Sequence, residues 1–274
     1  FIIFLFQDAA GEYGERRYDV MNYLIIVLAV FGVIACGLTG ALWHLQTAKR
    51  MIAKDLQYGL VIDNIKHAAI AVGILSGSAV GGIFGYYLAE NQGVSFVAWL
   101  GRMSYVFILC SGSSHVLVLI HAWLHIQREL FSRETSSNCL SNIRIDRLKY
   151  IETNHRHYID VRTRDDEVID DLIGFISEPI FNARRDMTRL PLYGYLGTVC
   201  GILLMAQELG RIDEASQTFK VLSSMATGLV LAFKTTLVAL LAYLPLRKII
   251  DLLINRLVEI EKLWRNQREE FDRR

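Results

Sequence analysis

The sequence predicts an all-α, polytopic membrane protein with about five transmembrane helices and long cytoplasmic helical extensions. Of its 274 residues, 53% are hydrophobic, and only three are prolines, which suits long uninterrupted helices. Apolar stretches alternate with segments that are dense in charges of both signs, as in a membrane protein with soluble flanks. The formal net charge of +1 gives no indication that the chain binds nucleic acid.

Five apolar stretches are long enough to cross the hydrocarbon core of a bilayer as helices. Residues 1–6 (FIIFLF) are too few to decide between a signal remnant, the end of a longer helix and an interfacial anchor. The expected spans are residues 21–43, 68–89, 97–125, 190–207 and 222–246. The expected organisation is an extracytoplasmic arm (1–20), three spans of which the first two are peripheral (21–125), a cytoplasmic helical region (126–189), a channel-forming helix pair (190–246) and a cytoplasmic amphipathic helix (247–274).

The distribution of basic residues sets the orientation of these spans. The 44–67 loop contains four Lys or Arg residues, whereas the 90–96 loop contains none. Cytoplasmic loops carry the excess of Lys and Arg, so the 44–67 loop, the 126–189 region and the C-terminal tail are expected in the cytoplasm. The N-terminus is then expected outside.

Periodic patterns predict how two of these elements pack. In the second span, glycines recur every four residues, which gives a helix a smooth stripe that another helix can approach closely. These glycines are Gly73, Gly77, Gly81 and Gly85. In the tail, apolar residues at 250, 253, 257, 260 and 264 recur at spacings of three and four, which predicts one amphipathic helix that continues from the last span.

The fourth span contains the stretch PLYGYLGTVCG, whose residues are unusually small for a membrane helix. Gly194, Thr198 and Gly201 share one helical face, and Gly197 broadens it. Close helix packing explains such a face, with the threonine hydroxyl bonded to a carbonyl of the preceding turn. An ion pathway also explains it, because hydroxyls can donate, accept and order water.

The fifth span presents a similar face and favours the second interpretation. Ala232, Thr236 and Ala239 share this face, and Thr235 lies beside it. Neither span contains a carboxylate, and a proton path normally needs a group that binds and releases protons at the working pH. A pathway through this chain is therefore expected to be completed by a partner.

At these residues the chain resembles the MotA/TolQ/ExbB proton-channel family. The second-last helix of TolQ and ExbB proteins reads approximately P-L-L-G-L-L-G-T-V-x-G, and this chain matches it except at Tyr193 and Tyr195. The last helix matches more weakly, with Leu231 where those proteins carry a glutamate and Ala239 at a usual glycine. The resemblance covers about residues 185–265 and extends to the order of elements. Five spans, however, exceed the three of TolQ and ExbB and the four of flagellar MotA. One interpretation of the difference is a specialised stator, such as a ZorA-like motor subunit.

The resemblance implies a function and a set of partners. Family members form a homopentamer around a dimer of a single-span partner that supplies a membrane aspartate. The complex, a stator or related molecular motor of the bacterial cell inner membrane, uses proton or sodium flow to do mechanical work by rotation. Ion-pathway residues carried over to this chain are Thr198, Thr236, Thr235, Gly194, Gly197, Gly201, Ala232 and Ala239.

Other polar residues in the spans leave alternatives open. Lys234 and Tyr195 are candidate partner contacts, although Lys234 can also reach the interface or backbone carbonyls. Ser113, Ser114 and His115 raise the alternative of an intramembrane enzyme, but adjacent residues on a helix point in different directions. A non-conducting membrane scaffold is the other alternative. We expect no enzymatic activity, no cofactor and no metal site, and we expect contacts with membrane lipids.

Overall fold

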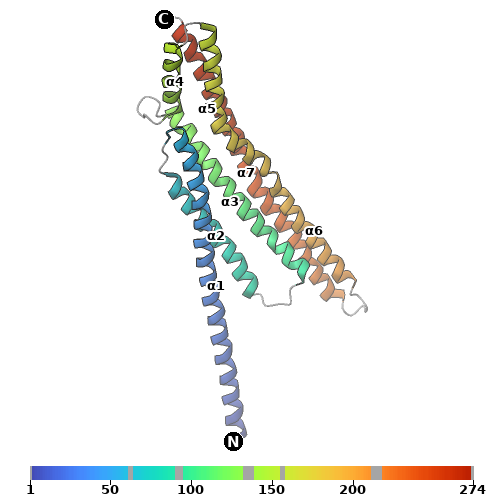
Figure 1. Ribbon diagram of the computed structural model, residues 1–274. Helices are drawn as coiled ribbons and strands as arrows, with labels where there is room; N and C mark the ends of the chain where they lie inside the picture. Colours follow the sequence, from blue (N-terminus) through green and yellow to red (C-terminus); the bar gives the residue numbers. More distant parts are fainter. Residues whose placement is uncertain are drawn as a thin grey trace.

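The computed structural model describes residues 2–60, 64–89, 95–131, 139–154, 158–210 and 218–272, with side chains from residue 26 onward except at some helix ends. All secondary structure in these ranges is helical, which confirms the all-α prediction (Figure 1). Five helices in the described part are long and apolar enough to cross a membrane. The helices are α1 (Ile2–Gln57), α2 (Asn64–Ala89), α3 (Phe96–Phe131), α4 (Leu140–Asn154), α5 (Tyr158–Asp186), α6 (Arg189–Leu209) and α7 (Thr218–Asp272).

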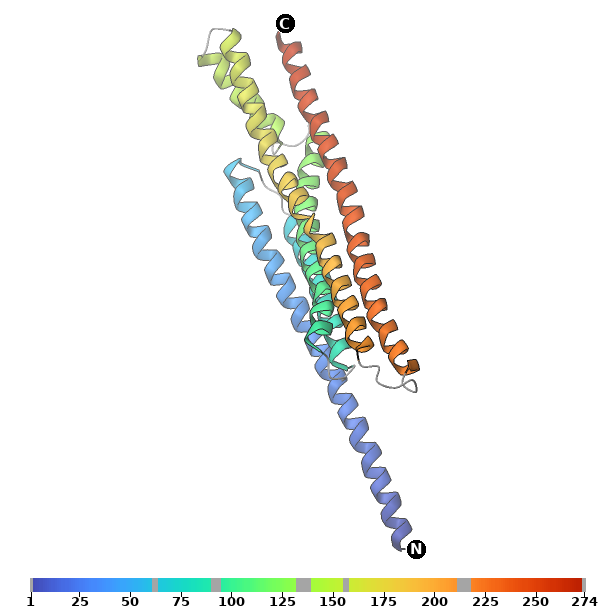
Figure 2. The same ribbon diagram turned by 90° about the vertical axis from the view of Figure 1, so that its right-hand side faces the viewer.

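The helices form two groups. Helices α1 and α2 pair with each other, and α3, α6 and α7 pack together beside them (Figure 1). Helices α5 and α6 follow one another through the turn at Met187 and Thr188, and together they run antiparallel to α7 (Figure 2). Helix α4, the start of α5 and the last turns of α7 lie at one end of the bundle, called the charged end below.

The glycine stripe of α2 packs against α1, as its spacing predicts. A Cβ added at Gly73 would lie 2.5 Å from Cα of Ala41, and one at Gly81 would lie 2.7 Å from Cα of Val33. At Gly77, an added Cβ would overlap the carbonyl of Cys36. The two backbones approach so closely that a side chain at these positions has no room.

The C-terminal tail is one continuous helix with the last span and buries the face predicted from its spacing. Ile250 and Leu253 are fully buried, and Leu257, Ile260 and Trp264 are almost fully buried. These residues pack against an apolar face of α5 and against the second half of α3. The buried α5 residues are Ile169, Leu172, Ile176, Ile180 and Ala183.

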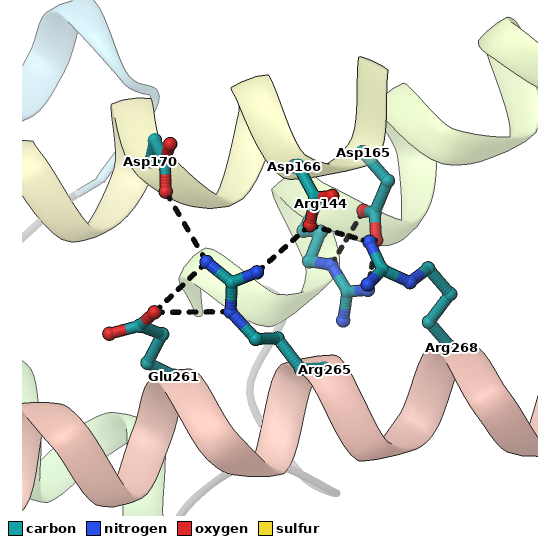
Figure 3. A network of polar contacts seen from close by, with 7 residues as sticks. All are labelled: Arg144, Asp165, Asp166, Asp170, Glu261, Arg265 and Arg268. Carbon is teal, nitrogen blue, oxygen red and sulfur yellow. Dashed lines mark hydrogen bonds and ion pairs between the residues drawn. The ribbon is translucent and has the colours of Figure 1, made fainter. Parts of the chain in front are cut away.

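At the charged end, ion pairs join α4, α5 and α7 (Figure 3). The guanidinium of Arg144 on α4 donates to both carboxylate oxygens of Asp165 on α5, at 2.9 and 2.7 Å, and both side chains are buried. Arg268 on α7 contacts Asp165 at 3.4 Å and Asp166 at 2.6 Å. Arg265, one turn earlier on α7, also reaches Asp166, at 3.1 Å. A buried carboxylate needs such partners, because desolvating an unpaired charge is costly.

The end of α1 is tied to α5 by Tyr58. Its hydroxyl donates to Asp171 at 3.3 Å, and its ring lies 4.3 Å from that of Phe175, measured between centroids. Burial, and then the negative charge of Asp171, raises the pKa of Tyr58, so the hydroxyl stays protonated as a donor. The chain then turns at Gly59, whose φ of +72° lies in the left-handed region that glycine adopts without strain.

Candidate functional site

Helices α6 and α7 meet through small residues that face each other. Gly194, Gly197 and Gly201 of α6 are buried. An added Cβ would lie 2.5 Å from Cβ of Ala239 at Gly194, and 2.8 Å from Cβ of Ala232 at Gly201. The glycine side of α6 is therefore covered by α7 of the same chain, and the two backbones are in near contact.

Two threonines lie inside this interface and share a hydrogen bond. Oγ1 of Thr198 on α6 and Oγ1 of Thr236 on α7 are bonded to each other. Thr198 also has the carbonyls of Gly194 and Ala232 within 3.2 Å, and Thr236 has that of Ala232 at the same distance. Each hydroxyl has one proton, so one threonine donates to the other, and the second proton goes to a backbone carbonyl.

The two hydroxyls can pass on a hydrogen bond, but they cannot take up or release a proton near neutral pH. Both threonines are only partly buried, so a water molecule or a partner group can approach them. Their protons can rotate between acceptors, but a hydroxyl does not bind or release a proton near neutral pH. The sequence of the two helices from 190 to 207 and from 222 to 246 contains no aspartate or glutamate. A titrating group for this site has to come from elsewhere.

Thr235, the neighbour of this pair, has different surroundings. Its side chain is buried against Gly197, and its hydroxyl lies 3.0 Å from the carbonyls of Leu231 and Ala232 in its own helix. This is the back-bonded arrangement of a packing threonine. Its assignment to an ion pathway stays a prediction, like those of the glycines and of Ala232 and Ala239.

The α6–α7 pair is also the part of the chain that matches a known protein family. Residues 187–266, which cover α6 and most of α7, match the model of the MotA/TolQ/ExbB proton channel family. This part of the chain is similar to that family. The match confirms the resemblance inferred from the sequence and supports a general proton-channel role. Searches of curated proteins and of solved structures gave no significant match.

Helix α3 packs against the α6–α7 pair from one side. A Cβ at Gly101 of α3 would lie 3.0 Å from both Cβ of Cys200 on α6 and Cδ2 of Leu231 on α7. Leu231 is the position where the sequence lacks the glutamate of TolQ and ExbB proteins, and here its side chain packs toward α3. The ring of Phe107 lies 5.6 Å from that of Tyr193, which adds an aromatic contact between α3 and α6.

Lys234 and Tyr195 lie outside the α6–α7 interface. Both side chains are exposed on this chain, with Tyr195 at 67% exposure. A lysine at this depth needs a counter-charge or a path to water, because a central lysine costs about 2.5–3.5 kcal/mol on insertion scales. Their contact with a partner stays a prediction.

Ser113 and Ser114 of α3 are not arranged as a nucleophile with His115 as its base. The hydroxyls of Ser113 and Ser114 both donate to the carbonyl of Cys110 at 3.0 Å. His115 instead faces Ser111, with 3.5 Å between Nε2 and Oγ. A hydrolase needs its serine within hydrogen-bond reach of the base, and neither of the two predicted serines makes that contact here.

Sequence reasoning missed one polar site, formed by Asp55 of α1 with His121 and His125 of α3. The two histidines lie in the third predicted span, whereas Asp55 lies in the 44–67 segment that was expected to be a cytoplasmic loop. The signal that could have revealed a shared site is the spacing of four residues between the histidines, which places both imidazoles on one helical face. The aspartate lies 66 residues before His121, so only the tertiary structure brings it there.

Proposed function

We propose that the chain is the proton-conducting subunit of a motor in the bacterial inner membrane. In this proposal, five copies surround a dimer of a single-span partner, and the aspartate of that partner takes and releases the proton. The N-terminus lies outside the cell, and the charged end lies in the cytoplasm. The complex converts the movement of ions into mechanical work.

The observation that carries the proposal is the hydroxyl pair of Thr198 and Thr236 within a segment of the MotA/TolQ/ExbB family. Two hydroxyls that share one bond and remain partly accessible can order water or meet a carboxylate. The absence of a carboxylate from residues 190–207 and 222–246 fits a channel whose titrating group is supplied by a partner.

The exposed faces of α6 and α7 leave room for further subunits. Tyr195, Leu192 and Ile202 of α6 are more than half exposed on this chain, as are Phe233 and Leu237 of α7. In a membrane, such faces are covered by lipid or by neighbouring helices. A ring of copies would cover part of this surface, and lipid would cover the rest.

The position of the basic residues of α1 supports the proposed orientation. The end of α1, which carries Lys49, Arg50 and Lys54, approaches the same end of the bundle as the C-terminus (Figure 1). The position of these basic residues beside the charged end agrees with the positive-inside rule, whereas Arg16 and Arg17 of the N-terminal arm do not.

The test is to express the chain with its single-span partner, determine the stoichiometry by native mass spectrometry, and measure proton flux in vesicles. We expect a 5:2 complex that conducts, and a Thr198→Val/Thr236→Val double variant that assembles but conducts about ten- to hundredfold less. Thr227→Val is the matched control, because this threonine lies in α7 outside the pair and bonds to Ser223 of its own helix. An intact complex with no flux in the wild type would favour the non-conducting scaffold.

A further inference from the structure

Three side chains from two helices converge at the charged half of the bundle. Asp55 of α1 is fully buried, and His121 and His125 of α3 are each 6% exposed. Nε2 of His121 lies 2.9 Å from Oδ2 of Asp55, and Nε2 of His125 lies 3.1 Å from Oδ1. The two Nε2 atoms are 3.2 Å apart.

With the carboxylate ionised, no placement of protons satisfies all three contacts. If both Nε2 atoms carry a proton, each histidine donates to Asp55, and the two nitrogens lie 3.2 Å apart with no hydrogen bond between them. If only one carries a proton, the other nitrogen turns a lone pair toward a carboxylate oxygen. A buried polar contact of this kind is unfavourable unless something else lies between the groups.

A divalent metal ion satisfies the three groups together. All three ligand atoms lie within 4.8 Å of one another, and each residue offers one lone pair. Tetrahedral zinc, with bonds of about 2.0–2.1 Å, places its ligand atoms about 3.3 Å apart, which is close to the 3.2 Å between the two Nε2 atoms. Two imidazoles and one carboxylate are ligands that zinc commonly uses with a fourth position left for water.

The surroundings provide access and a rigid wall. A cavity of about 260 Å³ borders the three residues and is also lined by Glu178 and Asn182 of α5. Arg50 and Lys54 of α1 line it as well, and the carboxylates of Asp55 and Glu178 balance their two positive charges. The ring of Phe175 packs edge-on against His125, with 5.7 Å between centroids, and holds that imidazole in place.

We propose that Asp55, His121 and His125 bind a divalent transition-metal ion, with zinc as the expected occupant. The ion joins α1, the peripheral helix, to α3, which packs on the α6–α7 pair. It therefore fastens the α1–α2 pair to the channel-bearing group. The proposal does not depend on whether the channel conducts.

The experiment uses the full chain, purified in detergent, stripped with a chelator and titrated with Co²⁺. We expect one equivalent to bind per chain, with the visible absorption of low-symmetry Co²⁺, and Zn²⁺ to displace it. Zn²⁺ is also expected to raise the thermal unfolding midpoint, since an ion that binds the folded state stabilises it. A wild-type chain that binds no Co²⁺ or Zn²⁺ stoichiometrically would overturn the proposal.

Variants separate this site from adventitious binding. Asp55→Asn and the double variant His121→Ala/His125→Ala should lose both the absorption and the shift of the midpoint. His115→Ala is the control, because His115 lies on the same helix and contacts Ser111 instead of the cluster. Helical content by circular dichroism shows that each variant is folded. Equal binding by the control and by a folded double variant would place the metal elsewhere and contradict the assignment.

Discussion

Gly197 of α6 and Thr235 of α7 lie in direct contact across the interface of the helix pair. A Cβ at Gly197 would lie 2.5 Å from both Cβ and Oγ1 of Thr235. The hydroxyl of Thr235 is bonded within its own helix, so this contact is one of shape and not of hydrogen bonding. The spacing between α6 and α7, and with it the approach of Thr198 to Thr236, depends on the absence of a side chain at position 197.

Replacing Gly197 by alanine should force the two helices apart. Overpacking of this kind costs about 1–3 kcal/mol, which lowers the thermal unfolding midpoint of the purified chain. Gly82→Ala is the matched control, because Gly82 lies in a membrane helix with nothing within 4 Å of an added Cβ. The control should unfold at the wild-type temperature or slightly above it, since alanine favours helix. Equal midpoints for the two variants would show that α6 and α7 separate without cost.

The fold was predictable from the sequence to the extent that it depends on local patterns. The apolar face of the tail, from Ile250 to Trp264, follows from spacing alone, because a helix repeats every 3.6 residues. The small face around Gly194 was also predictable. Its partner was not, because a face rich in small residues fits a neighbouring helix and a pore equally well. The contact of Asp55 with His121 joins residues far apart in the chain, so no local sequence pattern predicts it.

Replacing Gly77 by leucine should separate α1 from α2 without touching the α6–α7 pair. An added Cβ there overlaps the backbone of Cys36, so a leucine has no position to occupy. We expect low yield or poor assembly, measured by gel filtration in detergent. Gly82→Leu, on the same helix in open surroundings, should assemble normally. Normal assembly of Gly77→Leu with loss of ion flux alone would assign the glycine stripe to the conduction pathway instead.

Replacing Asp165 by asparagine should destabilise the charged end. Asp165 is fully buried and accepts two hydrogen bonds from the equally buried Arg144, so its loss leaves a buried guanidinium without its counter-charge. Removing one partner of a buried pair costs about 3–5 kcal/mol. Asp146→Asn is the control, because Asp146 and Lys149 are exposed and 3.9 Å apart, and exposed pairs contribute little. Denaturant unfolding followed by circular dichroism compares the two. A loss of similar size in both would mean that burial of the Arg144 pair does not matter.

If Thr198 and Thr236 act together in an ion pathway, their valine substitutions should not have additive effects on proton flux. Thr198 and Thr236 share one hydrogen bond, so either valine substitution removes the same bond. If both hydroxyls serve one water molecule or one carboxylate of a partner, each single variant should lose most of the flux, and the double variant should lose little more. A single loss of about 1–3 kcal/mol corresponds to roughly ten- to hundredfold in rate. The measurement is proton flux of the assembled complex for the two single variants and the double, with assembly checked by gel filtration. Losses that add fully would mean that the hydroxyls act separately, and normal flux in an intact double variant would remove both threonines from the ion pathway.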